Sequence, residues 1–333
     1  MTQEQAAPGS RGRHAGPVIV GPPSVAAQRA ALAGRARRLL AACRAYPLAT
    51  VGALTLIAMA GFCFLGPLVY HADLAHVFLS RENLSPRAGH PLGTDEDGVD
   101  ELGRLMAGGQ VSLEVGGAAG ILAAVLGSMW GAVAGYFGGV LDAAMMRIVD
   151  AAIAIPAVVL LVLLVSIYRP STTMLLLVIA GTSWLSTARL VRAEALMLRV
   201  REYVEASRVM GGGGLRVILR HITPNAMGTI VVNVTFQVAS AIMILATLSF
   251  LGFGVQFPSV DWGDMIAAGI QTISDGYWWQ IVFPGVAIAV VVVALAMLGD
   301  GLRDAFSAEY SGTGPEATAV RAASETQMLR AGR

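Results

Sequence analysis

The sequence predicts an all-α integral membrane protein with six transmembrane helices, and three observations support this fold class. Of the 333 residues, 55% are hydrophobic and 14% are charged, whereas an ordinary soluble protein has about 25% charged residues. Six charge-free apolar runs approach or exceed the ~20 residues that a helix needs to cross the hydrocarbon layer. Arginine-rich and arginine-poor segments alternate between these runs, as expected when successive loops lie on opposite sides of a membrane.

The predicted elements follow the apolar runs in chain order. Residues 1–47 form a cytosolic tail, of which 1–30 lacks apolar periodicity and is expected to be disordered. The arginines between residues 29 and 44 predict a basic segment at the membrane interface. The first helix covers 48–70, which begins too late and runs too long for a cleaved signal peptide. An external loop, 71–110, follows it.

A core of five more helices occupies residues 111–302, and a second cytosolic tail occupies 303–333. In the long run Ile222–Val260, Pro224 and the glycines near its end confine the helix to its centre. The predicted spans of the core are Val115–Leu141, Ala151–Tyr168, Ser171–Ala188, Gly228–Leu251 and Gly276–Gly299.

The distribution of arginine predicts the orientation of the chain. Residues 1–47 contain seven arginines and one acidic residue, and the stretch from Arg189 to Arg220 contains seven arginines. Residues 71–110 contain three arginines and seven acidic residues, and 252–280 contain three aspartates and no basic residue. Because basic loops stay on the cytoplasmic side, both termini are predicted to be cytoplasmic.

Composition also excludes several functions. All 23 basic residues are arginine, so the chain cannot supply the lysine of a P-loop or of a Schiff base. If ATP is used, another chain hydrolyses it. The two cysteines have no CxxC spacing and the five histidines are scattered, so neither a disulfide framework nor a metal site is expected. The net charge of +1 points to no partner.

The segment 201–225, REYVEASRVMGGGGLRVILRHITPN, is the most informative part of the sequence. Tyr203, Ser207 and Met210 share one helical face. The glycines at 211–214 then break the helix and supply the positive φ values of a sharp turn. A second short helix, Leu215–His221, is expected to end at Thr223-Pro224. The pattern predicts a helical knuckle under the membrane, suited to a groove on another protein or to a lipid surface.

The knuckle resembles the EAA loop of ABC-transporter permeases, the element that docks into a cleft of the cytoplasmic ATPase. The family pattern corresponds to Glu205-Ala206-Ser207, to Gly211 and to Thr223-Pro224. The resemblance implies an ATPase-coupling set, and its residues are Tyr203, Glu205, Ala206, Ser207, Arg208, Gly211, Leu215 and Pro224.

Further motifs narrow the resemblance to the C-type subunits of dipeptide and oligopeptide importers and their nickel-importing relatives. They are His90–Asp95 (HPLGTD), Ala134–Gly139 (AGYFGG), Ala188–Arg192, Arg220–Asn225, Leu248–Gly252, Trp262-Gly263 and Leu298–Asp304. The external region departs from the family at Val99, Gly103 and Gln110. Its candidate contacts for a substrate-binding protein are Asp95, Asp100, Arg104 and Trp262.

The resemblance implies the type I ABC importer permease fold and a permease subunit in a bacterial cytoplasmic (inner) membrane that carries di- or oligopeptides, or alternatively nickel or another small cargo. It implies a sister permease subunit, two ATP-binding cassette subunits or one fused ATPase, and an external substrate-binding protein. ATP and Mg would bind to the ATPase and no cofactor to this chain. No nucleic-acid partner is expected.

Polar residues within the predicted spans leave alternatives open. Asn233, Gln237 and Ser240 fit either a translocation pathway or helix packing, because both use the same residue types. Glu114 is expected at the water-facing outer rim and Asp150 is expected to pair with Arg147.

A rival from another class is a proton-coupled secondary transporter in which Glu114 or Asp150 carries the proton. No inverted repeat supports this alternative. A membrane-embedded enzyme is a third alternative, although the sequence has no G-x-S-x-G elbow and no histidine pair at metal-ligand spacing.

Overall fold

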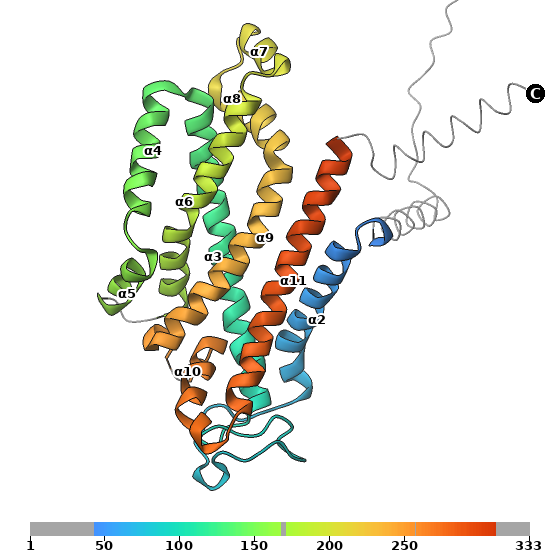
Figure 1. Cartoon of the computed structure of the whole chain (residues 1–333), viewed down its shortest axis with the longest axis vertical. Coiled ribbons are helices and arrows are strands. Elements are labelled where there is room, and N and C mark those ends of the chain that lie inside the picture. The colour runs from blue at the N-terminus through green and yellow to red at the C-terminus, as the bar shows by residue number, and fades with distance from the viewer. Residues whose placement is uncertain (1–42, 168–170, 257, 311–333) are drawn as a thin grey trace, which may run out of the picture. The chain divides into compact units, whose positions relative to one another are not determined.

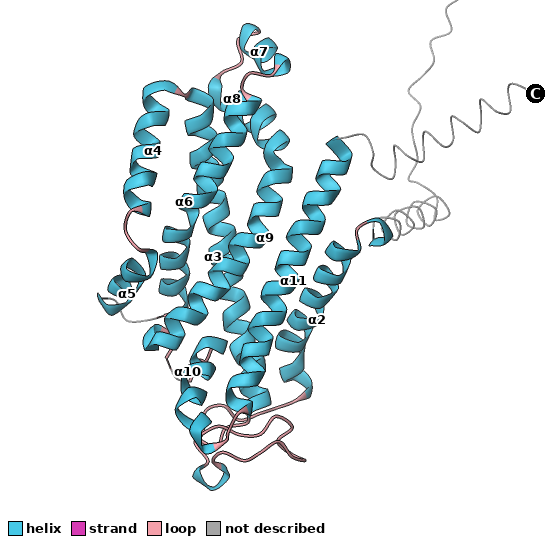
Figure 2. Ribbon diagram, viewed as in Figure 1, coloured by secondary structure: helices cyan, strands magenta, loops and turns pink. Residues whose placement is uncertain are grey.

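The computed structural model describes residues 43–167, 171–256 and 258–310. The predictions for the start of the chain and for 311–333, including the expected disorder of 1–30, lie outside the described residues. The chain divides into two compact units, 1–44 and 45–333, and the helices below belong to the second. The described residues form helices and loops and no named strand (Figure 2).

Five helices are long and apolar enough to cross a membrane (Figure 1). They are α2 (Pro47–Val69), α3 (Glu101–Phe137), α6 (Thr172–Leu198), a continuous helix Gly214–Phe253 that contains α9 (Thr223–Leu248), and α11 (Trp279–Tyr310). A bent pair, α4 (Gly139–Ile153) and α5 (Ala157–Ile167), supplies a sixth candidate span. This architecture confirms the predicted all-α integral membrane fold.

The remaining elements are short and lie at the ends of the spans. The segment between α2 and α3 contains the 3-10 turn η1 (Leu79–Arg81), and α7 (Glu202–Val209) follows α6. On the side of the bundle opposite α7, α10 (Trp262–Thr272) and η4 (Ile273–Asp275) connect α9 to α11.

The central helix of the bundle is α3, which packs against α6 and α9. Glycine makes this close approach possible: a Cβ on Gly120 would lie 2.6 Å from Cα of Val238, and one on Gly127 would lie 2.5 Å from the carbonyl oxygen of Trp184. Within a membrane the hydrophobic effect does not drive helices together, so close van der Waals contact between small residues stabilises their packing instead. Below this contact, Val115 of α3 packs in a cluster with Leu175 of α6 and Leu245 of α9.

Two helices extend beyond their predicted limits because charged side chains have partners. α3 begins at Glu101 and not at Val115, since Oδ1 of Asp100 accepts a hydrogen bond from the N–H of Gly103 (2.9 Å) and caps the helix. α6 continues ten residues past Ala188 to Leu198, carrying Arg189 and Arg192 to ion pairs with α4. The loop that was predicted over 71–110 therefore ends at Asp100 in the structure.

The third span differs from the single helix predicted over Ala151–Tyr168. The structure has α4 and α5 meeting at 77° across a short break that includes Pro156. Proline lacks the N–H that a continuous helix needs and clashes with the preceding turn, which accounts for the break.

The helix that follows the knuckle passes through Pro224, where the sequence analysis predicted an end. α8 (Gly214–Val217) leads into a π-helical turn, Ile218–Ile222, and α9 begins directly at Thr223. A π turn opens the hydrogen-bond ladder by one residue, and Pro224 occupies the first turn of α9, where proline is tolerated. At the other end a second π turn, Ser249–Phe253, closes at Gly252 (φ +84°). α11 runs on to Tyr310, so 303–310 is helical.

Candidate coupling loop and transport surfaces

The predicted knuckle is present and extends beyond the ends of α6 and α9 (Figure 1). α7 ends at Val209, and Gly211 adopts φ +82°, a conformation that side chains other than glycine rarely take. Of the four adjacent glycines it alone has positive φ, so the prediction of several such values is wrong. Gly213 is the N-cap residue of α8 at φ −65°. Gly211 alone therefore supplies the positive φ at which the chain reverses its direction.

The exposed residues of the knuckle form an apolar tip. Val209 is 88% exposed, Met210 80% and Leu215 68%, an arrangement that suits burial against another protein. Ser207 is buried and Met210 is not, so the predicted shared face of Tyr203, Ser207 and Met210 is not the packed face. The residues of the predicted coupling set other than Ser207 are exposed, namely Tyr203, Glu205, Ala206, Arg208, Gly211, Leu215 and Pro224.

The knuckle is attached to the end of α3 by a contact that the sequence analysis did not identify. The guanidinium of Arg208 lies over the ring of Tyr136, 4.7 Å from its centre. Gly214 packs closely against Tyr136 and Phe137, and Nη1 of Arg199 donates to the carbonyl oxygen of Gly135 (3.3 Å). The AGYFGG motif was the available signal, but it carried no assigned role.

A cavity of about 490 Å³ lies between α6, α9 and α11 near the same end of the bundle. Its lining combines charged, polar and apolar side chains, including Glu194, Arg201, Thr229, Asn233, Arg303 and Phe306. The guanidinium of Arg303 also lies 5.9 Å from the ring centre of Phe236 on α9.

Two of the three predicted pathway residues tie helices together. Oδ1 of Asn233 accepts a hydrogen bond from Oγ1 of Thr187 (2.7 Å), and Nε2 of Gln237 donates to the carbonyl oxygen of Ser183 (2.6 Å). Both bonds join α9 to α6. Asn233 also lines the cavity, whereas Gln237 is buried and Ser240 is exposed.

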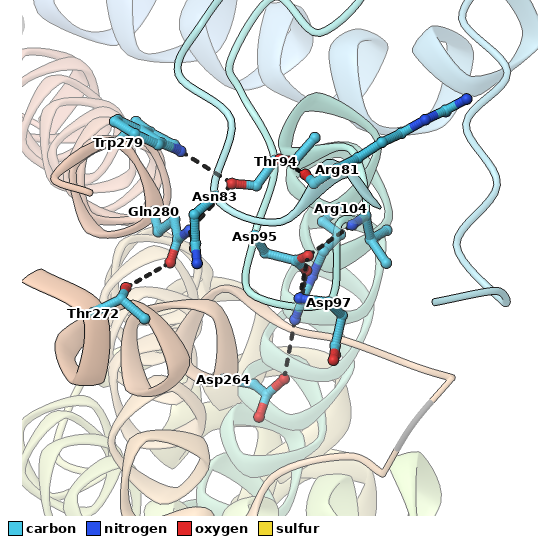
Figure 3. Close-up of polar contacts among 11 residues, drawn as sticks. Arg81, Asn83, Thr94, Asp95, Asp97, Arg104, Asp264, Thr272, Trp279 and Gln280 are labelled. Carbon is cyan, nitrogen blue, oxygen red and sulfur yellow. Dashed lines mark hydrogen bonds and ion pairs between the residues drawn. The ribbon is translucent and has the colours of Figure 1, made fainter. Parts of the chain in front are cut away.

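The segment between α2 and α3, which was predicted to be external, is held to the bundle by buried polar contacts (Figure 3). Oδ1 of Asp95 accepts hydrogen bonds from the N–H groups of Val99 (2.7 Å) and Asp97 (3.0 Å), and its Oδ2 pairs with Arg104. On α11, Nε1 of Trp279 donates to the carbonyl oxygen of Thr94 (3.1 Å). Thr94 and Asp95 thus connect the HPLGTD motif to α3 and to α11.

Asp100 joins the same region to the end of α2. Its Oδ2 lies 2.7 Å from Nδ1 of His90 and accepts a hydrogen bond from the hydroxyl of Tyr70 (2.9 Å). Burial, together with the hydrogen bond to Asp100 and the charge of Asp100, raises the pKa of Tyr70 to about 12. The phenol therefore stays protonated and remains a donor at physiological pH.

These contacts correct the predicted external contact set. Trp262 is fully buried, and its Nε1 donates to the carbonyl oxygen of Leu105 (2.9 Å). Asp95 and Asp100 are also buried, and the Arg104 side chain is only 16% exposed. In this chain the four residues hold the segment between α2 and α3 in place, and of the four only Arg104 is partly exposed.

A small acidic recess does open at the α10 end of the bundle. Glu96, Asp97 and Asp264 line it together with the partly exposed Arg104. Burial raises the pKa of Glu96, assisted by the nearby Asp97 and Asp95 carboxylates, and burial also raises the pKa of Asp264.

The charged residues of α4 pair with α6. Asp150 lies 2.6 Å from Nη2 of Arg189, so the predicted pairing with Arg147 is wrong. Asp142 receives two hydrogen bonds from Arg192, at 2.5 and 2.7 Å, a bidentate pair that the sequence analysis missed because the residues are 50 positions apart. Glu114 lies within α3, thirteen residues after the helix begins at Glu101.

Comparison with known proteins agrees with this arrangement. Residues 127–311 match the family described as binding-protein-dependent transport system inner membrane component. The chain is 37% identical over 258 residues to the dipeptide transport system permease protein DppC of Bacillus subtilis, covering 78% of this chain and 81% of that protein.

Other relatives lead to the same family. The oligopeptide transport system permease protein OppC of Bacillus subtilis is 34% identical over 262 residues, which is 79% of this chain and 86% of that protein. A putative peptide permease protein of Brucella suis is 42% identical over 225 residues, which is 67% of this chain and 74% of that protein. With its helical bundle and its knuckle, the chain belongs to the family of inner-membrane components of binding-protein-dependent transport systems.

Proposed function

We propose that this chain is the permease subunit of a peptide importer driven by a separate ATPase, with the knuckle as its ATPase contact. The exposed apolar tip of Val209, Met210 and Leu215, held beyond the bundle by α7 and the turn at Gly211, is the observation that carries the proposal. Such a tip is costly in water and is stabilised by burial in a partner groove.

The proposal assigns the two ends of the bundle to opposite sides of a cytoplasmic membrane. The end with α7 and its arginines is cytoplasmic, as are both termini, and the end with α10 and the acidic recess is external. A substrate-binding protein meets the external end, and a sister permease completes the membrane passage. ATP and Mg bind to the ATPase chains, whose closure pushes the knuckle and shifts the bundle between two states.

The relatives support peptide as the cargo, since they are named for dipeptides, oligopeptides or peptides. Uptake of labelled di- and oligopeptides, measured in cells with and without this chain, tests this part of the proposal. Nickel uptake in the same cells tests the alternative cargo. Proton-driven uptake by the purified chain alone in liposomes would contradict the proposal as a whole.

Gly211→Asp tests the coupling role. Aspartate at φ +82° is strained, and its charge would lie within the apolar tip. We therefore expect that the ATPase no longer copurifies with the variant and that peptide uptake falls at least 10-fold. Membrane insertion should be unchanged, because the side chain would face open space. Gly213→Ala, at an ordinary φ in the same turn, is the matched control and should retain both activities. Normal uptake by well-inserted Gly211→Asp protein would defeat the coupling assignment.

A further inference from the structure

One face of α3 carries an acidic side chain at membrane depth. α2 and α3 are neighbours that run in opposite directions, with Gly66 packed against Met106 and Cys63 against Gly109. Continuing this register along both helices places Glu114 level with residue 58, the middle of α2 (Pro47–Val69). At 1.5 Å per residue this is about 16 Å from either end of α2, near the centre of a ~30 Å hydrocarbon layer.

The contacts of α3 with α9 give the same depth. Gly116 packs against Ile242 and Gly120 against Val238, so the same register places Glu114 level with Ile244. Ile244 lies well inside the span Gly214–Phe253. Glu114 is therefore far from either membrane surface.

The carboxylate of Glu114 has no polar partner in the part of the chain that the structure describes. Its side chain is exposed, and no described residue donates a hydrogen bond or an ion pair to it. The acids of α4 differ, since Asp142 and Asp150 each pair with an arginine of α6. Ionisable side chains inside membrane spans almost always face protein or a water-filled cavity and have a partner, because hydrocarbon cannot solvate them.

The residues around Glu114 favour protein over water. Ala118, Ile121 and Val125 follow on the same helical face, and Ile121 and Val125 are 54% and 49% exposed. A Cβ added to Gly117 would meet nothing within 4 Å. Small residues beside one acid leave room for a second helix to approach closely, and the apolar residues next to them match its dry surface.

We propose that the α3 contact face, formed by Glu114, Ala118, Ile121 and Val125, binds a transmembrane helix of the sister permease subunit. That helix places an arginine or lysine against the Glu114 carboxylate. A basic residue satisfies the charge that neither the described residues of this chain nor lipid can satisfy. The inference rests on the proposed function, because it requires the sister subunit.

Photo-crosslinking in the complete transporter, in native membranes, tests the α3 contact face. Ala118 is replaced by p-benzoylphenylalanine, and the adduct is identified by mass spectrometry of its peptides. The expected result is one adduct with a membrane helix of the sister permease. Ile57, which is 68% exposed on α2 close to the same depth, is the matched control and should give no such adduct. Adducts with lipid alone at Ala118 would overturn the proposal.

Substitutions at Glu114 test the ion pair. Glu114→Leu should lower the amount of sister permease that copurifies in mild detergent at least threefold, and Glu114→Gln should lower it less, because the amide can still accept a hydrogen bond. Glu114→Arg should be rescued by an acidic substitution of the basic residue that the crosslink identifies. Unchanged copurification of Glu114→Leu would contradict the pair.

A separate outcome would assign this face to the cargo passage. In a Cys43→Ser background, Glu114→Cys would then react with a membrane-impermeant thiol reagent, and cargo would slow the reaction. That result overturns the helix contact while leaving the importer assignment intact. Wild-type protein that copurifies no sister permease at all would instead count against the proposed function itself.

Discussion

Asp261 shows how one buried carboxylate can shape the α10 end of the bundle. It is fully buried, its Oδ1 accepts hydrogen bonds from the N–H groups of Gly263 (2.8 Å) and Asp264 (3.2 Å), and its Oδ2 accepts one from Ser249 (2.6 Å). Burial raises its pKa above the ordinary 3.8, and the hydrogen bond from Ser249 offsets part of that rise. The carboxylate therefore caps α10 and links it to the end of α9. The unfavourable free energy of burying its charge opposes this stabilisation.

The raised pKa of Asp261 predicts how stability changes with pH. The folded state holds this proton more tightly than the unfolded chain, so the group's contribution is fully present below pH 3.8 and is lost as pH rises through the folded pKa. Asp261→Asn keeps an acceptor for α10 without the charge. We expect its unfolding temperature in detergent to equal or exceed that of the wild type at pH 7.5, with the difference shrinking as the pH falls toward 3.8.

Asp261→Ala is the contrasting variant, since it leaves the N–H groups of α10 and the hydroxyl of Ser249 without their acceptor. Its free energy of unfolding should fall by about 2 kcal/mol. If Asp261→Asn were as unstable as Asp261→Ala at pH 7.5, the negative charge itself would be what stabilises the fold.

The HPLGTD motif shows where sequence reasoning about single residues ends. HPLGTD was located from the sequence, but its aspartate was assigned to the outer surface, and so was Trp262. The structure buries both, because Trp262 donates to Leu105, 157 positions away, and Asp95 pairs with Arg104 beneath the loop. Composition identifies a polar residue near a span end, but only tertiary packing decides whether it faces water or holds the segment in place.

Whole helices were more predictable than their ends. The long charge-free runs located the five long spans, because crossing a membrane sets a minimum apolar length, but they did not predict the bent pair α4 and α5. Their ends depended on contacts with other helices: the cap by Asp100 moved the start of α3, and the ion pairs of Arg189 and Arg192 extended α6. Pro224, read as a stop, is accommodated by the π turn before it.

The stacked pair Arg208 and Tyr136 gives a prediction about how elements are coupled. It is the contact that joins α7 to the end of α3, so it can pass a push on the knuckle to the centre of the bundle. Tyr136→Leu removes the ring, and a cation–π contact at an exposed site is worth about 0.5–1 kcal/mol. We expect about two- to fivefold less peptide transported per ATP hydrolysed by the assembled transporter in liposomes.

Tyr136→Phe is the matched control, because it retains the aromatic face and should keep the wild-type ratio of transport to hydrolysis. Combining Tyr136→Leu with Arg208→Gln should cause little further loss, since each change removes the same contact. Additive losses would show that the two side chains act separately.

For the molecule as a whole, the question is which surface the cargo meets. The hydrogen bonds of Asn233 and Gln237 hold α9 to α6, while Ser240 on the same helix is exposed. If the passage runs along α9, Ser240→Leu should change which peptides compete for uptake while leaving the unfolding temperature unchanged. Gln237→Leu should instead lower stability by about 1 kcal/mol, the usual value for a hydrogen bond between membrane helices.

The competition profile distinguishes a passage from a packing surface, because stability alone cannot report on cargo. Ala118→Leu on α3 is a useful comparison, since the α3 contact face is assigned to the sister helix and its alteration should change assembly and not cargo preference. A changed profile with Gln237→Leu and an unchanged one with Ser240→Leu would reverse the assignment and place the passage at the α6 and α9 contact.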